Sequence, residues 1–214
     1  MTLFSILALG FFLGTRHATD SDHVIAVTTI VSQQRRVSSA ALTGISWGIG
    51  HSITLLIVGA AIILLGVVVP ERLGMSLEFC VALMLVLLGL LNLASSRRNR
   101  KEVHEHSPSD RFCLINRSVV IGVVHGLAGS AAVALLVLPM IREPAWAILY
   151  LLIFAVGTIA GMMLITAIIA VPITYSANRF QSFNRYIGAA AGVFSVGFGL
   201  FLVHQVGFVD GLLR

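Results

Sequence analysis

Six long apolar segments dominate the sequence, and they restrict the fold more than any other feature. They run from about Thr2 to Val31, Ser39 to Val69, Met75 to Ser95, Ser118 to Ile141, Ala145 to Ile173 and Tyr186 to Val206. A helix needs about 20 mostly apolar residues to cross a hydrocarbon core about 30 Å thick. Helices also satisfy their backbone polar groups internally, as that core demands. The sequence therefore predicts an all-α polytopic membrane protein, a bundle of six transmembrane helices.

Composition and charge agree with this class. Hydrophobic residues make up 57% of the chain and charged residues 11%, against about 25% charged in soluble domains. The net charge of +5 does not indicate a nucleic-acid partner, because the basic residues lie in short loops between apolar segments, where they set topology. Ten lie on one expected side, namely Arg35, Arg36, Arg97, Arg98, Arg100, Lys101, Arg111, Arg117, Arg179 and Arg185, against Arg72, Arg142 and Arg214 on the other. The asymmetry predicts an integral cell (inner) membrane protein with both termini outside the cytoplasm.

The first apolar segment carries a dense polar motif, Arg16-His17-Ala18-Thr19-Asp20-Ser21-Asp22-His23. An ionisable group at membrane depth costs about 2.5–3.5 kcal/mol, so it usually faces a partner or a transport pathway. Histidine and carboxylate together suit divalent transition metals. We therefore expect His17, Asp22 and His23 in a metal site, with Asp20 either a ligand or a group that orients an imidazole. The alternative is a polar cluster that only holds helices together.

One regular helix cannot direct all four of these side chains to one point, because each residue turns by about 100°. His17 and Asp20 share a face, whereas Asp22 falls far from it. The sequence therefore predicts either an unwound helix near Gly14 and Thr15 or ligands that act through one another.

Two further histidines lie inside apolar segments. His51 follows glycines that permit close helix approach, in Trp47-Gly48-Ile49-Gly50-His51-Ser52. His125 opens the small-residue run His125-Gly126-Leu127-Ala128-Gly129-Ser130. Either could be a hydrogen-bonded or packing residue of the bundle. We expect both in the metal site, since other intramembrane histidines accompany them.

The two halves of the chain resemble each other. Gly14 and His17 precede Gly122 and His125 by 108 residues, and Gly50 precedes Gly157 by 107. Val86-Leu87-Leu88-Gly89-Leu90 resembles Val196-Gly197-Phe198-Gly199-Leu200. Three spans per half predict a 3+3 inverted repeat, an architecture typical of secondary transporters. The expected units are residues 1–95, a polar cytoplasmic loop at 96–117, and residues 118–214.

Other chemistries find little support. We find no nucleophile motif, phosphate loop or CxxC pair, so the chain is not expected to be an enzyme or to carry a cofactor. Cys80 and Cys113 are badly placed for thiol or electron transfer, the function of one alternative class of membrane protein. His104 and His106 lie in the polar loop, where a solvated segment is a simpler interpretation than metal capture.

The motif His17 to His23 resembles the H-x4-D-H signature of the nickel/cobalt transporter family, and Arg16 matches as well. Trp47 to Ser52 is similar to the Gly-His-Ser element of that family. The run that begins at His125 stands where the eight-span uptake permeases have an acidic motif, and it is similar to the smaller six-span UreH-type and HupE-type relatives. The resemblance implies Ni²⁺ or Co²⁺ transport, in which the histidines and aspartate of H-x4-D-H are essential.

We therefore predict a secondary transporter of Ni²⁺, Co²⁺ or both, in the direction of uptake. Two alternatives stay open: an exporter of the same family, and a non-transporting accessory protein for urease or hydrogenase maturation. The expected partners are the metal ion as substrate, the lipid bilayer and, for the accessory alternative, a metallochaperone or nickel-enzyme maturation protein.

Overall fold

The computed structural model describes residues 3–32, 34, 36–66, 70–97, 108–127, 141, 143–179 and 181–213. All of the regular elements in these ranges are helical. They are α1 (Leu3–His17), α2 (Ser21–Val31), α3 (Val37–Leu65), α4 (Glu71–Arg97), α5 (Pro108–Leu127), α7 (Pro144–Arg179), α8 (Gln181–His204) and a short π-helix, η3 (Gln205–Val209). His104, His106 and the run Ala128-Gly129-Ser130 lie outside the described residues, as does the side chain of Cys113.

Four of the described helices are long and apolar enough to cross a membrane. They cover Val37–Leu65, Glu71–Ser96, Pro144–Ser176 and Tyr186–Val209, and two shorter apolar helices cover Ser21–Val31 and Leu114–Leu127. Large apolar side chains such as Phe4, Ile57 and Leu65 are exposed on the outside, which suits contact with lipid. The all-helical, polytopic membrane class predicted from the sequence is therefore confirmed.

Two expected segments differ in detail from the helices found. The first is not one long helix but two, α1 and α2, which are separated by residues 18–20. The helix of the fourth begins at Pro108 rather than at Ser118. Serine, aspartate and arginine follow Pro108, and proline is favoured in the first turn of a helix, where its missing N–H is not needed. The polar residues that follow Pro108 therefore belong to α5 and not to the loop expected from the sequence.

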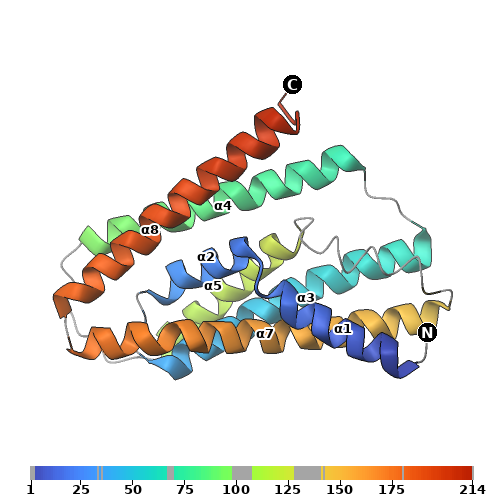
Figure 1. Ribbon diagram of the computed structural model, residues 1–214, viewed down its shortest axis with the longest axis horizontal. Coiled ribbons are helices and arrows are strands. Elements are labelled where there is room, and N and C mark those ends of the chain that lie inside the picture. Colours follow the sequence, from blue (N-terminus) through green and yellow to red (C-terminus); the bar gives the residue numbers. More distant parts are fainter. Residues whose placement is uncertain are drawn as a thin grey trace.

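The helices form two groups (Figure 1). In that view α4 and α8 run together along the top, while α1, α3 and α7 lie below, with α2 and α5 between the two groups. Helix α3 packs against both α5 and α7, and α1 packs against α7. Helix α4 packs along α8, and α2 contacts α4, α7 and α8. The two groups therefore meet through α2 and through direct contacts of α7 with α8 and of α4 with α5.

Glycines set the closest of these contacts. A Cβ atom on Gly14 of α1 would collide with the Phe154 carbonyl oxygen of α7. In the same way, a Cβ on Gly122 of α5 would collide with the Trp47 carbonyl oxygen of α3. Backbones approach this closely only where small residues stand at the interface. Both contacts bring the ends of α1 and α5 near the middle of the longer helices.

The α4–α8 pair is held in a similar way. A Cβ on Gly89 would lie 2.7 Å from the Gly192 carbonyl oxygen, and one on Gly199 would lie 2.9 Å from that of Ala82. The Ser195 hydroxyl donates a hydrogen bond of 2.8 Å to the Leu85 carbonyl oxygen across the same interface. These contacts make the pair a compact unit next to α2.

Candidate metal centre

The polar motif is built around a turn between two helices. Helix α1 ends at His17, and the amides of Thr19 and Asp20 donate to the carbonyl oxygens of Arg16 (2.8 Å) and His17 (3.1 Å). Asp20 then adopts an extended backbone (φ −60°, ψ 146°) as the N-cap of α2. The turn brings the rings of His17 and His23 together, with centroids 4.7 Å apart. Two short helices joined by this turn therefore bring His17 and His23 together, which one regular helix could not do.

The position of this break differs from one of the two sequence expectations. We expected an unwound helix near Gly14 and Thr15, but α1 continues through both to His17. Gly14 instead meets the backbone of α7. A glycine in an apolar segment has two uses, a break or a close approach, and here packing decides in favour of the second.

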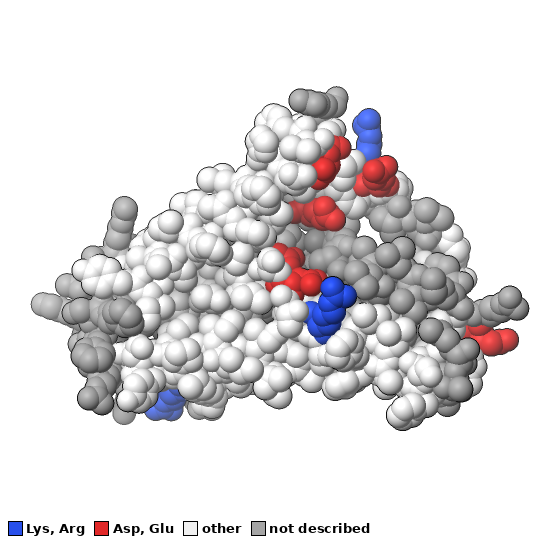
Figure 2. Space-filling model, viewed as in Figure 1, with Lys and Arg blue, Asp and Glu red and all other residues white. Residues whose placement is uncertain are grey.

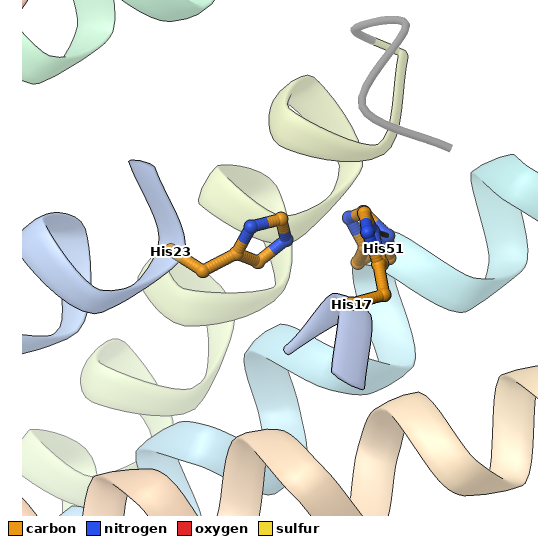
Figure 3. A group of neighbouring side chains, drawn as sticks. All are labelled: His17, His23 and His51. Atoms are coloured by element: carbon orange, nitrogen blue, oxygen red, sulfur yellow. Dashed lines mark hydrogen bonds between the residues drawn. The ribbon is translucent and has the colours of Figure 1, made fainter. Parts of the chain in front are cut away.

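Three buried imidazoles converge from α1, α2 and α3 (Figure 3). His23 extends toward His17 and His51. One ring nitrogen from each of the three histidines lies within 4.8 Å of the ring nitrogens offered by the other two. The Nε2 atoms of His17 and His51 are 3.0 Å apart. Imidazole nitrogens bind zinc at about 2.0–2.1 Å, so two nitrogens at right angles around one such ion lie about 3.0 Å apart. The spacing of this pair suits adjacent ligands of a first-row divalent ion.

Asp22 connects this group to the second half of the chain. Its Oδ1 accepts from the ring Nδ1 of His23 at 3.1 Å and its Oδ2 from Nε2 of His125 at 2.9 Å. Asp22, His23 and His125 form a second group with metal-ligand spacing, and it shares His23 with the first. The carboxylate is 18% exposed, whereas the side chain of His125 is fully buried.

Hydrogen bonds to carboxylates determine which imidazole nitrogens carry hydrogen. A carboxylate only accepts, so Nδ1 of His17 donates to Oδ2 of Asp20 at 2.8 Å, and the unprotonated Nε2 of His17 accepts from Nε2 of His51 at 3.0 Å. By the same argument His23 donates through Nδ1 to Asp22. Its Nε2 has no hydrogen-bond partner within the described part of the chain. Lone pairs on neutral imidazoles are what a metal ion needs.

The remaining two rings follow the same pattern. Nδ1 of His51 and Nδ1 of His125 also have no hydrogen-bond partner among the described residues, although both rings are fully buried. A buried polar atom without a partner costs about 1–3 kcal/mol. The unpartnered nitrogens of His23, His51 and His125 are therefore chemically available to a ligand.

Two helix ends add electrostatic support. His17 is the last residue of α1, and His125 lies in the last turn of α5. The carbonyl end of a helix carries a partial negative charge that favours a nearby cation. Together with the Asp22 carboxylate, these ends make the centre suitable for a divalent cation.

All six residues proposed from the sequence lie in this one cluster. Asp20 is the most peripheral, since its side chain is 43% exposed and contacts only His17 among them. The sequence interpretation overlooked Trp47, which is fully buried and stacks on His23 with ring centroids 5.5 Å apart. Trp47 precedes His51 by one helical turn, so their shared face was a signal that could have identified it.

Comparison with known proteins identifies the family of this chain. The family described as NicO, high-affinity nickel-transport protein, matches residues 3–112. The urease accessory protein UreH of Bacillus sp. (strain TB-90) is 40% identical over 225 residues, which cover 99% of this chain and 96% of that protein. The chain belongs to the NicO family.

Membership in the NicO family confirms the resemblance seen in the sequence and makes the chain a membrane protein of a nickel-transport family. The matched range contains His17, Asp20, Asp22, His23 and His51. His125 lies beyond that range and is connected to it by the contact with Asp22. No solved structure matches the chain.

Proposed function

We propose that this NicO protein is a secondary transporter that carries Ni²⁺, Co²⁺ or both through the membrane by way of the buried histidine centre. The observation that carries the proposal is the convergence of four buried imidazoles and Asp22 from α1, α2, α3 and α5. The proposed ligands are His17, Asp22, His23, His51 and His125, and Asp20 holds the His17 ring in position. Imidazole ligands favour Ni²⁺ and Co²⁺ over Mg²⁺ and Ca²⁺, which prefer oxygen.

We further propose an inverted repeat of two three-span units, residues 1–95 and 118–214, with a cytoplasmic segment at 96–117 whose residues from Pro108 onward are helical. Support comes from contacts that occur in matched pairs. Gly14 meets Phe154 and Thr158, and Gly122 meets Trp47 and His51. Likewise, Gly50 meets Val119, and Gly157 meets Phe11. Each contact becomes its mate when one half replaces the other, at the offsets of 108 and 107 residues noted in the sequence.

Uptake is the proposed direction, with both termini outside the cytoplasm. The membrane potential offers about 2.3 kcal/mol per charge for each 100 mV. A divalent ion gains roughly twice that on inward passage, on the order of a 10³-fold concentration ratio. Uptake therefore needs no coupling ion, whereas export by the same centre would require one.

The test is transport by the purified protein alone. Proteoliposomes with an inside-negative potential should accumulate ⁶³Ni²⁺, and His17→Ala should abolish accumulation while the protein remains monodisperse in detergent. Calorimetric titration of the same two proteins with Ni²⁺, Co²⁺, Zn²⁺ and Mn²⁺ reports binding independently. Binding without accumulation at any potential would contradict transport, and absence of binding would contradict the metal centre.

A second candidate is a non-transporting accessory protein that holds nickel for delivery to a maturation partner. It is favoured by one observation, the 40% identity to a relative from Bacillus sp. that is named urease accessory protein UreH. Such a protein would bind Ni²⁺ at the histidine centre but exchange it from one side only. The proteoliposome experiment separates the two candidates, because only a transporter carries ⁶³Ni²⁺ into a sealed vesicle.

A further inference from the structure

A cavity of about 250 Å³ adjoins the histidine centre between α2, α4 and α8. Its wall includes Ser21, Asp22, Glu78, Val81, Phe198 and Leu202. Glu78 is one of the few ionisable residues within the apolar part of α4, and the histidine centre does not use it. Its side chain is exposed.

Asp22 belongs to both places at once. Its carboxylate lines the cavity, and its Oδ2 lies 2.9 Å from Nε2 of the fully buried His125. One residue therefore forms the inner wall of the cavity and the edge of the histidine centre. An ion in the cavity that reaches Asp22 has reached the first ligand of that centre.

The cavity also suits a hydrated divalent cation in size and charge. A water molecule occupies about 30 Å³, so the six waters of a hydrated ion need about 180 Å³. The charged side chains in the wall, Asp22 and Glu78, are both acidic, and the rest of the wall is largely apolar. A cleft lined by one sign of charge with apolar walls concentrates the electric field and raises the rate of ion entry. Figure 2 shows several acidic side chains on this face of the molecule, with a basic side chain beside the lower of them.

We infer that this cavity is the entry vestibule of the histidine centre, and that Glu78 draws the hydrated divalent cation from water and passes it to Asp22. The inference rests on the proposed function, since it gives that transporter its access route. The vestibule lies on the side of the membrane where α4 begins and the chain ends. Glu78 is a positioning residue there and is not a ligand of the bound ion.

The first experiment measures how fast the ion arrives, independently of transport. Ni²⁺ association with the purified protein would be followed by stopped-flow quenching of Trp47 fluorescence, at low and high salt. Glu78→Gln should slow association about tenfold at low salt and remove most of its salt dependence. The calorimetric Kd should change less than about twofold, because entry and exit slow together. Glu71→Gln, an exposed carboxylate at the start of the same helix, is the matched control and should leave the association rate unchanged.

Two results would overturn the inference. Association rates equal to those of Glu71→Gln would show that Glu78 does not serve the route. Loss of equilibrium binding in Glu78→Gln would make Glu78 a ligand instead of an entry residue. If the wild-type protein bound Ni²⁺ but failed to transport it, the proposed function would fail, while the association rates would still test the vestibule.

A second variant tests the route without changing its charge. Ser21→Cys would be made in a chain in which Cys80 and Cys113 are replaced by serine. A bulky cationic thiol reagent attached at position 21 should slow Ni²⁺ association at least about tenfold, because it fills the cavity and repels the ion. The control is Gly74→Cys in the same background, since nothing lies within 4 Å of a Cβ placed at Gly74. Unchanged association after complete modification of Ser21→Cys would refute the vestibule.

Discussion

The contact between α1 and α7 and the contact between α5 and α3 are alike in packing and different in chemistry. In each, a glycine near the end of a shorter helix meets the backbone of a long helix, Gly14 against Phe154 and Gly122 against Trp47. Each shorter helix also has a histidine near its end. The two contacts differ in the polar residues around them. Helix α1 is followed by Asp20, Asp22 and His23, whereas at the other contact the long helix α3 contributes a histidine, His51.

The long helices differ in the same way. Gly14 approaches Thr158 on α7, and Gly122 approaches His51 on α3. Thr158 is fully buried and donates to its own helix, at Phe154, whereas His51 faces His17. Packing is therefore shared by both contacts, while all but one of the proposed ligands come from the first half. The backbone geometry and the metal chemistry can vary separately, and the following changes test that separation.

The largest effect is expected from His23→Ala. His23 belongs to both groups of potential ligands, so its loss should weaken Ni²⁺ binding at least about 100-fold and abolish transport. The matched change on the other side, Thr158→Val, removes a hydroxyl that donates to the Phe154 carbonyl oxygen of its own helix and should alter Kd less than about threefold. Calorimetry on both variants gives the comparison. Equal losses would mean that the two contacts share the chemistry as well as the packing.

Glycine substitutions should affect both contacts equally. Gly14→Ala and Gly122→Ala each place a Cβ against a carbonyl oxygen, and overpacking of this kind costs about 1–3 kcal/mol. Both should lower the melting temperature in detergent by several degrees. Gly74→Ala and Gly197→Ala meet nothing within 4 Å and should be neutral or slightly stabilising, because alanine favours helix. A large effect of Gly14→Ala alone would break the likeness between the contacts.

An intermediate effect is expected from Asp20→Asn. The carboxylate accepts from Nδ1 of His17 and so keeps the Nε2 lone pair directed at His51. An asparagine amide can turn its N–H₂ group toward the ring and favour the other tautomer. Changes to groups that orient a ligand cost about 10–100-fold in metal affinity, and partial exposure of Asp20 places it near the lower figure. A Kd unchanged from wild type would show that Asp20 has no positioning role.

The smallest effects concern the aromatic residues beside the histidines. Trp47 stacks on His23, and Phe154 lies against His17 with centroids 5.7 Å apart. Trp47→Phe and Phe154→Leu should each change the Kd for Ni²⁺ only a few-fold, since neither residue is a ligand. Ni²⁺ should quench the fluorescence of wild-type protein but not of Trp47→Phe, in which only the exposed Trp146 remains. Quenching that persists in Trp47→Phe would place the ion elsewhere.

The sequence predicted the helical membrane class because apolar segments of this length leave few other solutions. It also predicted the members of the cluster, since ionisable residues at membrane depth are costly and therefore informative. It failed to locate the helix break, because Gly14 is used for contact with α7 and the turn at residues 18–20 contains no glycine or proline. The role proposed for Glu78 was also beyond reach, because it depends on how α4 is rotated against α2.

The glycine contacts also determine how this protein can move. Helices that meet backbone to backbone have no flexible side chains between them, so each such interface is rigid. One rigid body contains α1, α3, α5 and α7, and the other contains α4 and α8. Tightly packed bodies shift as units and do not deform smoothly. Freedom of motion is thus concentrated where the two bodies meet, at α2 and at the contacts of α7 with α8 and of α4 with α5. A rocking motion there would alter the vestibule wall and the position of Asp22 in the same step.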